Sequence, residues 1–88
     1  MLPPLSPTRT IERVVREEWG RMFAALVKQF GDFQLAEDSL QDAVAKALEV
    51  WPSKGLPDAP AAWLISVARR GGIDRLRREK TSAKAGEE

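Results

Sequence analysis

Three residue types that carry much of the known side-chain chemistry are missing from this chain. It contains no cysteine, no histidine and no tyrosine among its 88 residues. Without cysteine there is no disulfide and no thiolate nucleophile, and a zinc site would lose its usual sulfur ligands. Without histidine there is no imidazole ligand or general base, and no Ser-His-Asp arrangement. An enzyme would have to work with carboxylates, lysine, arginine or serine alone.

Long apolar runs are also missing from the sequence. No stretch approaches the roughly 20 apolar residues that a membrane span needs. The first residues, Met1 to Pro7, have neither a basic start nor an apolar run, so they do not resemble a signal peptide. The sequence predicts a cytoplasmic protein without a membrane partner.

Apolar residues recur every three or four positions in three segments, which is the spacing of amphipathic helices. The predicted helices run from about Ile11 to Phe30, from about Gln34 to Pro52, and from about Pro60 to Lys80. Each carries one tryptophan on its apolar stripe, and we expect Trp19, Trp51 and Trp63 to meet in one core. The fold class is therefore predicted to be all-α, a compact three-helix domain.

The ends of these helices are marked by residues that cap or interrupt a helix. Thr8 or Thr10 can cap the first helix, and Gly31-Asp32 ends it. Prolines and a glycine between Pro52 and Pro60 predict a non-helical loop before the third helix. Gly71-Gly72 inside that helix would cost about 1.5–2 kcal/mol relative to alanine, which implies close packing, a bend or support from neighbouring helices.

These boundaries divide the chain into three parts. The three-helix domain covers residues 10–80. Residues 1–9, with three prolines before Thr8, are predicted to form a flexible leader. Residues 81–88, which are small and charged, are predicted to form a disordered tail.

Charge is balanced overall but uneven along the chain. The net charge is +1, yet the first 58 residues hold seven basic and nine acidic side chains, whereas the last 30 hold seven basic and four acidic ones. Arg70 and Arg77 share a ridge of the basic third helix, with Arg69 and Arg78 flanking it. Guanidinium groups bind phosphates and the guanine edge, so this helix is a candidate for nucleic-acid binding. From charge alone, a solvated helix whose arginines offset the helix dipole explains the pattern equally well.

The second helix carries an acidic face opposite its apolar stripe. Asp38, Gln41, Asp42 and Glu49 fall within about a third of the helix circumference. Two carboxylates four residues apart on an exposed face do not by themselves indicate acid–base catalysis. The face is either a solvated surface or a docking surface for a basic partner helix.

The loop between the second and third helices is a further candidate, because loops between packed helices often bind ligands. It holds Lys54. Trp63, just after the loop, is either a core residue or a surface on which an unpaired base can stack.

Four short motifs, taken in order, resemble region 2 of bacterial sigma-70-type sigma factors. The motifs are AEDSLQDA at 36–43, ALEVW at 47–51, WLISVARR at 63–70 and IDRLRR at 73–78. The first two resemble regions 2.1–2.2 and the last two regions 2.3–2.4. The chain is most similar to the extracytoplasmic-function (ECF) group, and its Gly31-Asp32 turn and Pro52–Pro60 loop are similar to an ECF subgroup with a helical-repeat C-terminal extension. The resemblance covers roughly Ile11 to Glu79.

The resemblance implies a transcription initiation factor domain that binds bacterial core RNA polymerase. Together with the missing residue types, this leads us to predict that the protein is not an enzyme, with no catalytic residue, no metal site and no cofactor. In the family, the polar face of the second helix docks on the clamp helices of the polymerase β′ subunit. That role carries over to Asp38, Gln41, Asp42 and Glu49. An anti-sigma factor or a C-terminal extension is a further partner that the resemblance allows.

The resemblance also implies recognition and melting of the promoter minus-ten element. The family's loop captures a base flipped from the non-template strand, which carries over to Ser53–Asp58, with Lys54 available to a phosphate. The third helix meets the duplex just upstream. The residues that match this role are Arg69, Arg70, Arg77 and Arg78.

Some features depart from the ECF pattern. Many members have asparagine in place of Arg70 and larger residues in place of Gly71-Gly72, which suggests a different promoter preference. No region 4 is present, so we expect the chain to be an excised domain or a truncated protein. The alternative function is a helical protein-interaction module without a DNA role. A helix-turn-helix regulator is less favoured, because no short helix and tight turn precede the third helix.

Overall fold

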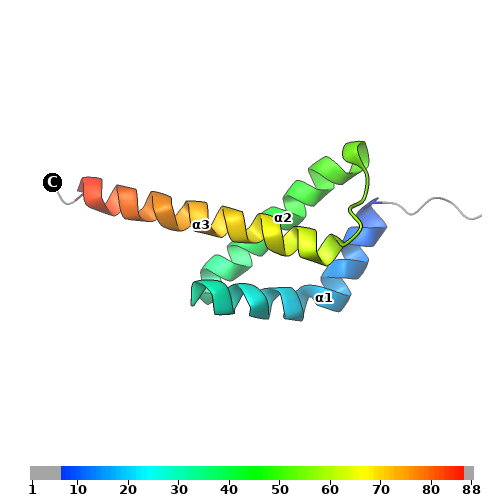
Figure 1. The fold of residues 1–88 in the computed structure, drawn as a ribbon, viewed down its shortest axis with the longest axis horizontal. Helices are drawn as coiled ribbons and strands as arrows, with labels where there is room; N and C mark the ends of the chain where they lie inside the picture. The colour runs from blue at the N-terminus through cyan, green and yellow to red at the C-terminus, as the bar shows by residue number, and fades with distance from the viewer. Residues whose placement is uncertain (1–6, 87–88) are drawn as a thin grey trace, which may run out of the picture.

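Three α-helices make up the part of the chain that the structure describes. The computed structural model describes residues 7–86, with side chains through residue 80. The helices are α1 (Pro7–Phe30), α2 (Phe33–Lys54) and α3 (Pro60–Gly86), and residues 7–86 include no strand. Every pair of helices is in contact, and the C-terminal part of α3 runs on beyond the other two (Figure 1). The predicted all-α, three-helix fold is confirmed.

The core lies where the apolar stripes of the three helices meet. Met22 and Leu26 of α1, Leu40 and Trp51 of α2 and Leu64 of α3 are each at most 1% exposed. Removing large side chains of this kind from water stabilises the fold by about 1.5–3 kcal/mol each. The periodicity of the sequence therefore identified the faces that pack together.

Two of the three tryptophans form a direct aromatic pair. The rings of Trp51 and Trp63 meet edge to face, with centroids 5.2 Å apart and planes at 68°. This is a favoured geometry for aromatic quadrupoles. Trp19 is partly buried and packs against the core cluster from α1. All three tryptophans thus contribute to one core, as expected, with the ring contact formed by α2 and α3.

The turn between α1 and α2 follows the predicted stop signal. Gly31 adopts a left-handed φ of 69° and donates its N–H to the carbonyl of Val27 over 2.7 Å. Asp32 then caps α2, because its carboxylate accepts a hydrogen bond from the N–H of Leu35 over 3.0 Å. A glycine at the end of one helix and an aspartate at the start of the next allow a very short connection.

Other helix ends differ from the sequence prediction. α1 already begins at Pro7, so Thr8 and Thr10 lie inside it, and the prediction that either caps the helix is wrong. Proline suits a first turn, whose N–H groups have no partner in the helix. α3 continues to Gly86, so residues 81–86 of the predicted tail are helical, as are residues 7–9 of the predicted leader. The rest of both predictions concerns residues 1–6 and 87–88, which lie outside the described part.

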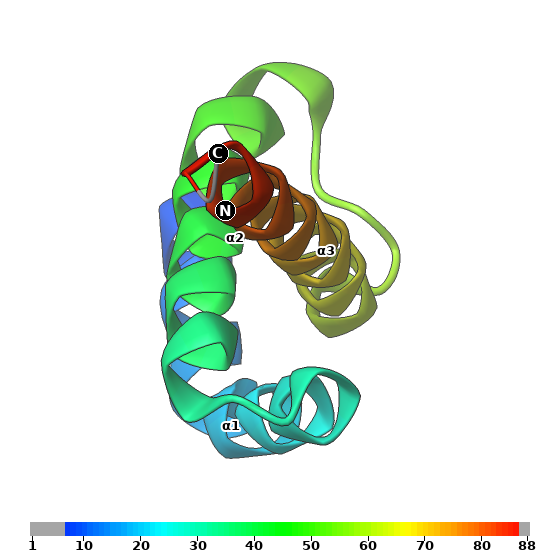
Figure 2. The ribbon, with the colours of Figure 1, turned by 90° about the vertical axis from the view of Figure 1, so that its left-hand side faces the viewer.

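The loop before α3 is shorter than predicted. α2 passes through Pro52 and ends at Lys54, where Gly55, with a φ of 93°, donates its N–H to the carbonyl of Trp51 over 2.9 Å. A proline so close to the helix end removes a single backbone hydrogen bond and is tolerated there. The connection therefore spans only residues 55–59, and it runs along the outside of the molecule (Figure 2).

Gly72 is a point of close approach between α3 and α1. A Cβ atom at this position would lie 2.7 and 2.9 Å from Cε2 and Cε1 of Phe30, and closer still to its Cζ. The neighbouring Gly71 has nothing within 4 Å of the same hypothetical atom. Of the explanations that the sequence left open for this glycine pair, close packing applies at Gly72.

Candidate functional site

The acidic face of α2, formed by Asp38, Gln41, Asp42 and Glu49, lies on the outside of the domain. Asp38 is half-buried and the other three are exposed. Because α2 turns its apolar stripe towards the core, its polar residues have to point away from it. The expected face therefore exists as a surface that a partner can reach.

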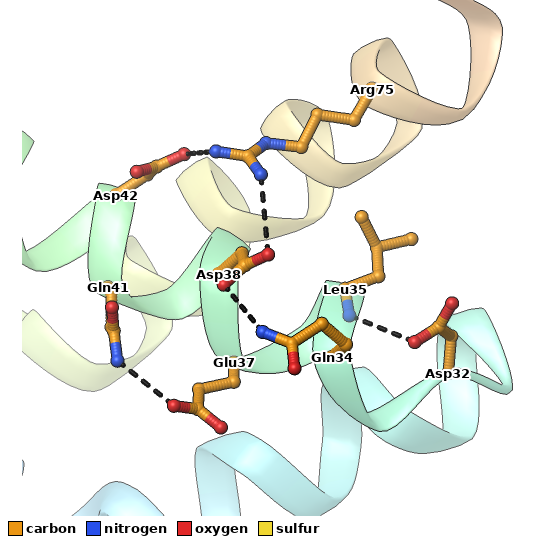
Figure 3. Close-up of polar contacts among 8 residues, drawn as sticks. All are labelled: Asp32, Gln34, Leu35, Glu37, Asp38, Gln41, Asp42 and Arg75. Carbon is orange, nitrogen blue, oxygen red and sulfur yellow. Dashed lines mark hydrogen bonds and ion pairs between the residues drawn. The ribbon is translucent and has the colours of Figure 1, made fainter. Parts of the chain in front are cut away.

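Local hydrogen bonds order the N-terminal part of this face. The side-chain amide of Gln34 donates to Asp38 over 3.0 Å, and that of Gln41 donates to Glu37 over 3.2 Å. Both pairs are four residues apart on the helix, so their side chains are neighbours on its surface. Figure 3 shows them along one side of α2.

Arg75 of α3 reaches across to the acidic face. One terminal nitrogen of its guanidinium lies 3.6 Å from Asp38, and the other forms a hydrogen-bonded ion pair with Asp42 (Figure 3). The exposed side-chain fractions are 39% for Arg75, 39% for Asp38 and 62% for Asp42. Water therefore screens the contact, and each exposed ion pair contributes about 0–1 kcal/mol.

Sequence reasoning did not single out Arg75, although one signal was available. Arg75 lies seven residues after Ala68 and eleven after Leu64, so it continues the buried stripe of α3. An arginine at the end of a core stripe faces the neighbouring helix rather than open solvent. Asp38 and Asp42, one turn apart on that helix, match its fork of donors.

The other arginines of α3 are exposed but do not form a single cluster. Arg70 and Arg77 are seven residues apart and share one side of the helix. Arg69 and Arg78 lie about 100° from this ridge, on opposite sides of it. Arg77 also has an interaction within the molecule. The predicted DNA-binding arginines of α3 are thus spread around about half of the helix circumference.

A groove between α2 and α3 brings two of the predicted site residues together. It is lined by Lys46, Val50, Lys54, Trp63, Val67, Arg70, Gly71 and Asp74. The sequence predicted Lys54 as a site residue in the loop and Arg70 as one on the third helix. Lys46 is a third cation in the groove, and the sequence did not predict it as a site residue. Its signal was the spacing of Lys46, Val50 and Lys54, which places them on one side of α2. We refer to this feature as the α2–α3 groove.

Trp63 has two environments at once. It is half-buried and packs edge to face on Trp51, and it also lines the α2–α3 groove. The core and stacking interpretations of this residue are therefore compatible. The groove combines apolar surface from Val50, Val67 and Trp63 with three cations, and its acidic member is Asp74.

The family comparison agrees with this arrangement of helices. The family model for Sigma-70 region 2 matches residues 14–82, which include all of α2 and most of α1 and α3. The chain belongs to the sigma-70 region 2 family. Sigma factors act in transcription initiation and form a family without enzymatic activity of its own. The resemblance that the sequence motifs indicated is thus confirmed at the level of the region 2 domain.

An uncharacterized protein of Rhizobium meliloti (strain 1021) is 49% identical over 55 residues, which are 62% of this chain and 13% of that protein. The chain therefore spans a small part of the length of that relative. No solved structure matches the chain.

Between residues 7 and 86, none of the three helices has both the length and the apolar composition that crossing a bilayer requires.

Proposed function

We propose that this region 2 domain belongs to an ECF sigma factor. It binds bacterial core RNA polymerase through the acidic face of α2. It recognises and melts the promoter minus-ten element with the α2–α3 groove and α3. The observation that carries the proposal is the α2–α3 groove, which Lys54, Arg70 and Trp63 line together. The family membership and the ECF-like motifs add independent support.

The acidic face suits a basic helical partner. Three of its four side chains are exposed, and Asp38 and Gln41 are each hydrogen-bonded to a residue one turn earlier on α2, so these two lose little side-chain entropy on binding. Charge complementarity of this kind speeds association and selects the partner more than it adds affinity. The clamp helices of the β′ subunit are the partner that the sequence resemblance implies.

The α2–α3 groove suits a single strand with an unstacked base. Aromatic surface stacks on bases of any sequence, while lysine and arginine neutralise the neighbouring phosphates. The cations of Lys46, Lys54 and Arg70 lie along the same groove as the indole of Trp63. Extruding a base costs a few kcal/mol of stacking energy, and capture in a protein pocket repays part of this cost.

The remaining arginines of α3 provide a contact with the flanking duplex. Arg69, Arg77 and Arg78 are exposed on α3 beyond or beside the groove. Contacts from arginine to the phosphate backbone position the protein and weaken as salt rises, without reading sequence. We assign sequence preference to Arg70 in the groove, since a guanidinium can also read a base edge, and sequence-independent affinity to Arg69, Arg77 and Arg78.

The polymerase contact is best tested away from Arg75, because substituting Asp38 or Asp42 also removes an ion pair with Arg75. We expect Gln41→Arg with Glu49→Arg to abolish binding to core polymerase in a pull-down. The matched control is Gln29→Arg with Glu12→Arg, which makes the same charge change at exposed positions of α1. Equal binding by both double variants would contradict the proposed interface.

The DNA contact is tested with fluorescent single strands in the presence of core polymerase. We expect the non-template minus-ten strand to bind more tightly than a random oligomer of the same length. Lys54→Ala with Arg70→Ala should remove most of this preference. Equal binding of both oligomers by the unmodified chain would point to a generic basic helix instead.

A protein-interaction module without a DNA role is the second candidate, and one observation favours it. Phe33 is 71% exposed and stacks on Phe23, with ring centroids 6.1 Å apart. Exposed aromatic surface is typical of protein contacts. Absence of DNA binding even with polymerase present would favour this candidate. A regulatory anti-sigma factor or a C-terminal extension stays a prediction from the sequence resemblance.

A further inference from the structure

Arg75 occupies the carboxylates that the proposed polymerase contact uses. It bridges Asp38 and Asp42, which are two of the three carboxylates of the acidic face (Figure 3). A basic partner helix approaching this face therefore meets side chains that already hold a guanidinium. The third carboxylate, Glu49, lies seven residues beyond Asp42 on the same helix and is exposed.

We infer that Arg75 is an intramolecular competitor of the basic partner, so that docking on α2 exchanges one guanidinium for another. The inference rests on the proposed function and names the chemistry of its partner: an arginine-bearing helix. Arginine is favoured over lysine because its planar fork can replace both contacts of Arg75, whereas an ammonium acts as a single point charge.

The contacts around the pair leave a partner arginine fewer acceptor sites on Asp38 and Asp42. Asp38 accepts from the amide of Gln34 over 3.0 Å and also pairs with Arg75. Gln34 thus donates to one carboxylate oxygen of Asp38, and Arg75 lies near the other. The second arm of the same guanidinium is bound to Asp42. A partner arginine gains its full set of contacts only when Arg75 withdraws from at least one carboxylate.

The exposure of the pair keeps this exchange easy. All three side chains are more than a third exposed, so water replaces the lost contacts as Arg75 withdraws. The packing of α3 on α2 does not depend on the pair, since Leu64 is buried and Trp63 is stacked on Trp51. Arg75 therefore lowers the affinity for the partner without preventing binding.

The test is the affinity of the unmodified chain and of Arg75→Ala for core RNA polymerase, measured across a range of salt concentrations. We expect the variant to bind about two- to fivefold more tightly at low salt, which is the range that one exposed ion pair supplies. The gain should shrink as salt rises, because screening weakens the partner's attraction to the freed carboxylates.

Two further variants separate the competition from other effects of the substitution. Lys80→Ala removes the same charge from an exposed position of α3, and it should leave the affinity unchanged. Arg75→Gln keeps much of the aliphatic stem and replaces Arg75→Ala if the alanine variant fails to fold by circular dichroism. Arg75→Lys, which keeps the charge without the fork, should fall between the unmodified chain and Arg75→Ala.

Each result decides the question. Tighter binding by Arg75→Ala or Arg75→Gln, with Lys80→Ala unchanged, supports competition. Unchanged or weaker binding by a folded Arg75 variant overturns it, because Arg75 would then support the interface. An equal gain from Lys80→Ala also overturns it, since net charge alone would explain the effect. Failure of the unmodified chain to bind polymerase at all would instead refute the proposed function itself.

Discussion

Replacing the two neighbouring glycines of α3 by alanine, one at a time, separates packing from helix propensity. Both substitutions gain the same intrinsic helix preference, about 0.8–1.0 kcal/mol. Gly71→Ala adds a methyl group where nothing lies within 4 Å, so the whole gain should appear as added stability. Gly72→Ala forces the new methyl group into the ring of Phe30, which has to shift.

The size of the difference follows from the overlap with Phe30. Overpacking a close contact typically costs about 1–3 kcal/mol. Because the propensity gain is common to both variants, the two should differ in free energy of unfolding by this packing cost alone. For a domain of this size, each kcal/mol shifts Tm by about 4–8 °C. Gly71→Ala should therefore melt at least about 4 °C above Gly72→Ala.

Thermal and urea unfolding followed by circular dichroism at 222 nm measure this difference directly. Phe30→Ala provides the internal control, since in that background the ring is gone and the two alanine variants should have nearly equal stability. If Gly72→Ala is as stable as Gly71→Ala in the unmodified background, the close approach of α3 to the end of α1 is wrong.

Three other substitutions test the cap, the core and the groove. Asp32→Ala should lower the free energy of unfolding by about 1 kcal/mol, because the N–H of Leu35 loses its acceptor, whereas Asp32→Asn should lower it little. Urea unfolding measures both variants, and equal losses would argue against the cap. Leu64→Ala should cost about 2–5 kcal/mol in the same assay, since Leu64 is fully buried; a loss below 1 kcal/mol would show that the site can collapse. Arg70→Ala should reduce the dependence of log K on log salt for single-stranded DNA by about one phosphate contact, and an unchanged slope would remove Arg70 from the groove's contacts.

Most of the fold could be predicted from local sequence patterns. The three- and four-residue spacing of apolar residues identified the buried faces, including Leu40, Trp51 and Leu64. The Gly31-Asp32 turn was identifiable because left-handed glycines and N-capping aspartates act locally. The start of α1 and the end of α2 were missed, because proline near a helix end is compatible with either continuing or stopping the helix.

The site was predictable in part, and the missing part is tertiary. The sequence separates exposed from buried positions on each helix, so Asp38, Asp42 and Arg70 were expected at the surface. It does not show which surface positions of α2 and α3 become neighbours. The Arg75 bridge and the place of Lys46 in the groove depend on how the helices cross, and that crossing is decided by packing of the whole core.

The brevity of the connection between α2 and α3 limits how this molecule can respond to a ligand. Five residues, even fully extended, reach only about 18 Å, and this segment includes a proline. The two walls of the groove are tethered at one end and joined by the contact of Trp51 with Trp63, which restricts their relative motion. On the proposed function, such a cleft would bind a base once it has left the stack, and a few glycines inserted after Gly55 would trade this selectivity for adaptability.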